Sequence, residues 1–69
     1  MSDESSAMRV RSCYELEAGA EIEARVGGEK HFEGQVTETH SKLRLFWAVD
    51  GVGVRRLIEL DEFEVYRLA

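Results

Sequence analysis

The chain has 69 residues, a net charge of −5 and a single cysteine, Cys13. This length allows one small domain, which buries only about 60% of the surface that its unfolded chain exposes. The acid excess argues against sequence-independent binding of nucleic acid, and one cysteine excludes both an internal disulfide and a Cys-x-x-Cys zinc site. The N-terminus, MSDESSAMRV, lacks the basic and then apolar character of a signal peptide. No apolar stretch approaches the roughly 20 residues that span a bilayer. We therefore predict a cytoplasmic protein that does not enter a membrane.

The N-terminal part divides into a tail and the start of a domain. Residues 1–7 carry Ser, Asp and Glu without apolar partners, which predicts a disordered acidic tail. Residues 8–69 are then one small β-barrel domain. Between Met8 and Leu16 the apolar residues Met8, Val10, Tyr14 and Leu16 occupy every second position, and the polar Ser12 interrupts this series. The pattern fits either a short strand or a single helical turn. Residues 20–26 alternate apolar and charged side chains, which predicts a half-buried strand.

Strand parity tests the hairpin suggested by Gly27-Gly28. A two-residue loop would place Ala24 opposite His31, so that an apolar side chain would face a polar one across the buried face. A three- or five-residue loop places Ala24 level with Phe32 instead, and we predict this longer loop. Gly34 stands in the middle of the next strand, where it predicts a sharp bend.

The best-defined hairpin follows a polar turn predicted over residues 37–42. The run LRLFWAV, residues 43–49, has Leu, Leu, Trp and Val at alternate positions, which is typical of a strand with one buried face. A four-residue loop over residues 50–53 sets a register that points Trp47 inward. The same register leaves Phe46 on the outside.

The C-terminal part completes an all-β fold. A tight turn at residues 60–62 precedes a last strand over residues 63–68, with a helix from Leu57 onward as the alternative. Short strands, tight turns and a mid-strand glycine predict a small five- or six-stranded, strongly bent antiparallel barrel. A short helical turn near its N-terminus remains an alternative to a strand there.

The stretch from Gly19 to Leu68 resembles the small barrels of the Src-homology-3-like class, which include Sm-like, Tudor-like and KOW proteins. The pattern AEIEARV–GGEKHFEGQV–LRLFWAV–RRLIELDEFEV is most similar to an Sm-like core, with a bent, Gly-containing second strand and a tight turn between its last two strands. This resemblance implies binding of RNA or a partner protein, often in rings. Residues 37–42 lack the Asp and Asn of that family's nucleotide-binding loop, so its RNA-binding residues are not carried over. Phe32–Gly34 and Trp47–Gly51 resemble the Tudor-like strand and turn pattern.

The outer face of the best-defined hairpin is the candidate binding surface. In the predicted register Phe46 and Leu57 form an outward apolar step flanked by arginines, and aromatic and Arg side chains are the usual anchors of interfaces. The alternative is that residues 8–14 fold back to cover this step. The candidate residues for binding a partner or nucleic acid are Lys42, Arg44, Phe46, Arg55 and Leu57.

We therefore predict a non-catalytic interaction module in RNA-linked or other nucleic-acid-linked regulation. The alternative is a protein-binding accessory subunit or homo-oligomer without a nucleic-acid role. We expect no enzyme activity, no cofactor, no metal and no small-molecule substrate. His31 and Glu33 supply at most half a metal site, and Cys13 has no orienting partner for nucleophilic catalysis.

Overall fold

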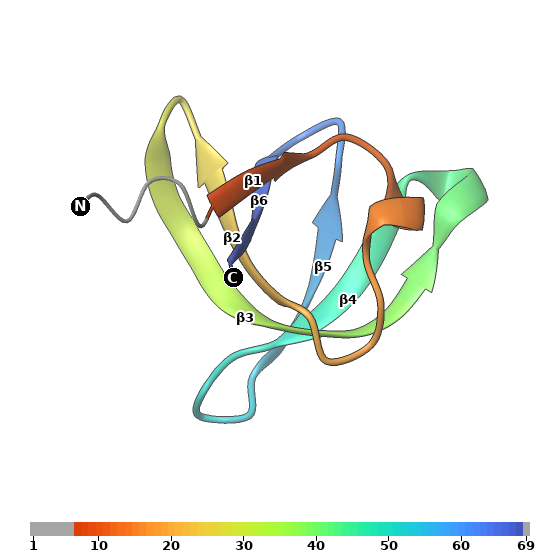
Figure 1. Cartoon of the computed structure of the whole chain (residues 1–69). Coiled ribbons are helices and arrows are strands. Elements are labelled where there is room, and N and C mark those ends of the chain that lie inside the picture. The colour runs from red at the N-terminus through yellow and green to blue at the C-terminus, as the bar shows by residue number, and fades with distance from the viewer. Residues whose placement is uncertain (1–6, 69) are drawn as a thin grey trace.

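The computed structural model describes residues 7–68 as an all-β fold, which confirms the predicted class (Figure 1). The six strands are β1 (Ala7–Val10), β2 (Glu21–Val26), β3 (Glu29–His40), β4 (Leu45–Val49), β5 (Arg55–Glu59) and β6 (Glu64–Leu68). They form one antiparallel sheet in the order β1-β6-β2-β3-β4-β5. The sheet is strongly bent but not closed, because its two outer strands, β1 and β5, do not pair with each other. Most of the predicted tail lies outside the described residues.

The inner face of the sheet forms one apolar core. Alternate residues of each strand point into it, as expected for strands with one buried face. Its largest fully buried side chains are Phe46, Ile22, Ile58, Val36 and Val65.

The segment before β2 combines both alternatives that the sequence left open. Residues 7–10 form strand β1, which pairs with β6, and Cys13–Glu15 form a single 3-10 turn, η2. Val10 and Cys13 enter the core, whereas Met8 and Tyr14 remain exposed. At the other end of the chain residues 64–68 form a strand, so the alternative of a C-terminal helix is wrong. In the part of the chain that the structure describes, no helix is long and apolar enough to cross a membrane.

The β2–β3 hairpin has a two-residue loop, so the prediction of a longer loop is wrong. Gly27 and Gly28 both have positive φ, 60° and 83°, which suits the type I′ turn that such hairpins favour. A register shift then leaves His31 unpaired on β3, as a β-bulge. Because the bulge restores the parity, Ala24 lies opposite Phe32, as the sequence predicted.

Strand β3 is longer than predicted, and β4 approaches it closely at Gly34. It runs to His40, so the turn predicted over residues 37–42 is wrong for residues 37–40; the 3-10 turn η3 (Ser41–Leu43) follows it. A Cβ at Gly34 would clash with the carbonyl oxygen of Val49 on β4 and would lie 2.8 Å from its carbon. The missing side chain therefore allows β4 to approach β3 at this point.

The β4–β5 hairpin is shifted by one residue from the predicted register. Asp50 and Val54 close a three-residue loop, in which Gly53 has a φ of 89° and donates to the Asp50 carbonyl oxygen at 3.1 Å. The Asp50 carboxylate accepts the N–H groups of Val52 and Val54 at 3.0 and 2.9 Å. A turn followed by a left-handed glycine is a common three-residue hairpin loop.

This shift exchanges the two aromatic residues of β4. Phe46 pairs with Ile58 and is 0% exposed, whereas Trp47 pairs with Leu57 and is only half-buried. The prediction that Trp47 points inward and Phe46 outward is therefore wrong. A slip of one residue moves every side chain of a strand to the opposite face, so the error extends along the whole of β4.

Candidate functional site

The outer face of β4 and β5 carries a row of apolar side chains. These residues are Leu45, Trp47, Val49 and Leu57, here called the outer apolar face, and all four are half-buried. They point away from the core because Phe46, Ala48 and Ile58 alternate with them and fill the interior. Trp47 and Leu57 lie directly opposite each other across the two strands. The surface thus has an aromatic and an aliphatic side chain at its centre.

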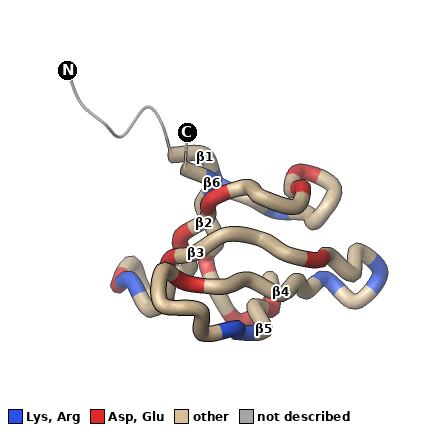
Figure 2. The backbone as a smooth tube through the Cα atoms, turned by 90° about the horizontal axis from the view of Figure 1, so that it is seen from below, with Lys and Arg blue, Asp and Glu red and all other residues tan. Residues whose placement is uncertain are grey.

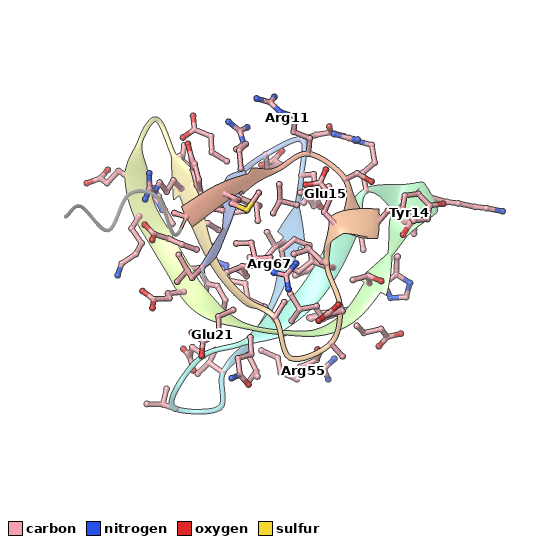
Figure 3. The ribbon with its side chains drawn as sticks, viewed as in Figure 1. Arg11, Tyr14, Glu15, Glu21, Arg55 and Arg67 are labelled. Atoms are coloured by element: carbon pink, nitrogen blue, oxygen red, sulfur yellow. The ribbon has the colours of Figure 1, made fainter. Side chains whose placement is uncertain are left out.

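Arg55 packs on the indole of Trp47. Its guanidinium carbon lies 4.8 Å from the ring centroid, within the range of a cation–π contact. Figure 3 shows Arg55 beside the β4–β5 hairpin, away from the η2 turn. The arginine covers part of the indole while leaving its charge at the surface, so the apolar centre carries a basic neighbour.

Strand β5 also presents a free backbone edge in the described part of the chain. Hydrogen bonds from Asp50 to Val54 and from Leu60 to Arg44 show that even-numbered residues of β5 face β4. In an antiparallel ladder the alternate residues point their N–H and C=O groups to the other side. Arg55, Leu57 and Glu59 therefore direct these groups away from β4, where the sheet has no further strand.

The structure brings together only part of the predicted site. Arg55 and Leu57 lie on the outer face, as predicted, but Phe46 is in the core. Arg44 adopts a left-handed conformation with a φ of 58°, and its Nε donates to Asp61 at 3.1 Å. Lys42 is exposed in η3, on a separate segment. The sequence analysis did not place Trp47 on the outer face. Recognising the three-residue loop between β4 and β5 would have given the correct register and placed it there.

Basic side chains do not form a continuous stripe across this surface. Figure 2 shows Lys and Arg positions in separate places along the backbone, with Asp and Glu positions between them. Glu38 lies next to Trp47 on β3, and Glu59 ends β5. This mixture of charges is unlike the basic groove with aromatic platforms that binds single-stranded nucleic acid.

The other candidate groups have structural partners. Cys13 is buried in the core and its thiol donates to the Leu45 carbonyl oxygen at 3.3 Å; burial raises the pKa of this thiol above its ordinary value. The ring of His31 meets Phe63 edge-on, with centroids 6.5 Å apart, and His40 lies 3.3 Å from a carboxylate oxygen of Glu38. Within residues 7–68, no three His, Cys, Asp or Glu side chains cluster in a way that could hold a metal ion.

A hollow beside Gly34 collects carboxylates that are already engaged. It is lined in part by Glu21, Glu33 and Asp50. Glu33 accepts from Lys30 at 2.9 Å, and Asp50 stabilises its own hairpin loop. Another hollow lies under η2, where Figure 3 shows Arg67 near Glu15 while Tyr14 points outward. Arg67 donates to the Glu15 carbonyl oxygen at 3.4 Å, so this basic group is engaged within the fold.

Comparisons with family models, with curated proteins and with solved structures found no match to this chain. The functional assignment therefore depends on the chemistry of the surface itself.

Proposed function

We propose that this chain is a non-catalytic interaction module that binds a polypeptide along strand β5. The observation that carries this proposal is the combination of the outer apolar face with the free edge of β5. An added strand forms main-chain hydrogen bonds with such an edge, while side-chain contacts beside the edge provide specificity. Leu57 and Trp47 are well placed to make those contacts, because Leu57 lies on the edge strand β5 and Trp47 lies opposite it on β4.

A polypeptide suits this surface better than a nucleic acid does. Phe46, the aromatic ring of the predicted binding surface, is in the core, and Arg44 is held by Asp61. The net charge of −5 also opposes the attraction of phosphates. The proposal therefore takes the sequence-based alternative, a protein-binding module, over RNA-linked regulation. The resemblance to Sm-like barrels is compatible with this proposal, since it implies partner proteins as well as RNA.

Arg55 has a defined role in this proposal. By packing on Trp47 it holds the indole against the sheet, so that less side-chain freedom is lost when a partner binds. Its exposed charge also favours a partner strand with an acidic residue at the matching position.

A peptide-display selection tests the proposal directly. The full chain is panned against random linear peptides, and binding of the selected peptides is measured by the fluorescence of Trp47, the only tryptophan. We expect peptides that bind the wild-type chain and lose about tenfold or more in affinity to Leu57→Ser, because the variant removes an apolar contact beside the edge. Tyr14→Ser is the matched control, because Tyr14 is 83% exposed on the separate η2 turn, and it should bind as the wild type does.

Two results would overturn the proposal. One is that no selected peptide discriminates between the wild type and Leu57→Ser, while thermal melting shows both to be folded. The other is that the chain binds single-stranded RNA, with an affinity that falls steeply with salt and is lost in Arg55→Ala. That second result would support the nucleic-acid function instead.

A further inference from the structure

We propose that the partner strand at β5 is β5 of a second copy of this chain, paired antiparallel about a two-fold axis at Leu57. This inference rests on the proposed function, because it uses the same edge and names its occupant. Its basis is a charge pattern in β5, Arg55-Arg56-Leu57-Ile58-Glu59, that is complementary to itself. Isologous pairing of this kind is the commonest symmetry of soluble homo-oligomers.

The central residue fixes the pairing of the others. With Leu57 opposite Leu57 of the second copy, Arg55 lies opposite Glu59 of the second copy, and the reverse pair forms on the other side of the axis. Arg55 and Glu59 project from the same face of β5, because they are four residues apart on a strand. Opposite charges therefore meet twice across the new strand pair, where such cross-strand pairs are stabilising.

Both charged residues are available for this contact. Arg55 and Glu59 are exposed, and neither belongs to any of the ion pairs found among residues 7–68. Some other surface charges are paired within the fold, such as Arg25 with Glu23 at 2.8 Å. The guanidinium of Arg55 can keep its contact with Trp47 while its free N–H groups point toward the edge.

The backbone groups of β5 suit the same register. The residues that point away from β4 are Arg55, Leu57 and Glu59, and this register sets each of them opposite another such residue. The two Leu57 residues can exchange two hydrogen bonds. Each flanking pair adds one bond, from the N–H of Glu59 to the carbonyl of Arg55. The Glu59 carbonyl already accepts the N–H groups of Glu62 and Phe63, both at 3.0 Å.

Competing registers and edges are disfavoured by charge and by coverage. A two-fold axis at Arg55 would place two arginines opposite each other, and an axis at Glu59 would do the same with two glutamates. The outer edge of β6 is covered by β1, so β5 cannot pair there. Charges on an edge strand normally prevent association. In this register they favour it.

Charge reversal with rescue tests the inference. Sedimentation velocity of the full chain over a range of concentrations should show a monomer–dimer equilibrium. Arg55→Glu and Glu59→Arg should each raise the dimer dissociation constant by about tenfold or more, because like charges then meet at both flanking pairs. The double variant Arg55→Glu/Glu59→Arg should restore dimerisation, because it recreates the opposite-charge pairs with exchanged signs. Arg11→Glu, at an exposed residue outside every strand, has the same change in net charge as Arg55→Glu and should leave the dimer intact.

The outcomes separate this inference from the proposed function. A chain that stays monomeric at its highest soluble concentration overturns the dimer. If selected peptides still bind at Leu57, the interaction module stands without it. A charge-swapped double variant that fails to dimerise although it is folded also overturns the inference. Species larger than a dimer whose assembly is unaffected by either charge substitution would indicate pairing of β5 with another edge, such as β1. This result would also overturn the inference. Dimerisation with rescue, in a chain that selects no peptide, supports the inference alone: β5 then pairs with a second copy, and the proposed binding of other polypeptides is overturned.

Discussion

Substitution of Gly34 by alanine should destabilise the fold through a backbone clash. An ideal Cβ at this position overlaps the carbonyl oxygen of Val49, lies 2.8 Å from the carbonyl carbon and lies 2.9 Å from Cε2 of Phe32. Two of these three atoms belong to the backbone of β4, so no rotamer change can relieve the contact. Overpacking of this kind costs about 1–3 kcal/mol, and we expect Gly34→Ala to be near the upper end. A chain of this size has a total stability of about 3–10 kcal/mol, so the loss should be large in proportion.

Urea unfolding followed by circular dichroism measures this loss. Gly51→Ala is the matched control, because nothing lies within 4 Å of a Cβ there and its φ is not positive. The control should be neutral or should gain up to about 1 kcal/mol, as the unfolded chain becomes less flexible. Equal midpoints for the two variants would refute the claim that β3 and β4 approach closely at Gly34. Complete unfolding of Gly34→Ala beside a folded Gly51→Ala is the extreme form of the expected result.

Other substitutions test the register, the loop and the buried thiol. Phe46→Ala should lose about 3–5 kcal/mol, as expected for a fully buried ring, and Trp47→Ala distinctly less; the reverse order in urea unfolding would place the tryptophan in the core. Asp50→Ala should cost about 1 kcal/mol by removing an acceptor of two N–H groups, whereas Asp50→Asn keeps an acceptor and should cost less. Equal losses would show that these hydrogen bonds do not stabilise the loop. Burial raises the pKa of Cys13, so stability should fall as the pH rises above the ordinary thiol pKa, because the unfolded chain then loses a proton that the folded chain keeps. Cys13→Ala should remove this dependence in unfolding measured across that range, and an unchanged slope would assign it to other groups.

The periodicity of the sequence was sufficient for most of the strands. The alternation over residues 20–26 and the β-rich composition of residues 63–68 correctly indicated β2 and β6, and the tight turn at residues 60–62 is present. These features are local, because each depends on a few neighbouring residues and on the choice of one buried face.

The register of β4 against β5 could not be obtained from periodicity. Both faces of β4 are apolar, with Leu45, Trp47 and Val49 on one and Phe46 and Ala48 on the other, so parity alone does not identify the inner face. The loop length decides it. The sequence does contain the relevant signal, an aspartate followed three residues later by a glycine, which suits a three-residue loop with a left-handed third position.

The candidate site was half predictable for the same reason. The sequence placed Arg55 and Leu57 correctly on the outer face of β5, but the register error put Phe46 beside them instead of Trp47. Arg44 was lost from the site because its left-handed backbone turns it toward Asp61. A single residue in a loop therefore determined which aromatic ring was available for binding.

The pairing of β1 with β6 brings the two ends of the described chain together, with Ala7 opposite Leu68 (Figure 1). A short linker could join these positions without crossing the core, and new termini could then be opened at the exposed Gly27-Gly28 turn, far along the chain from β5. The fold is thus suited to circular permutation, and a permuted chain would carry its fusion tags on the β2–β3 hairpin instead of beside β1 and β6.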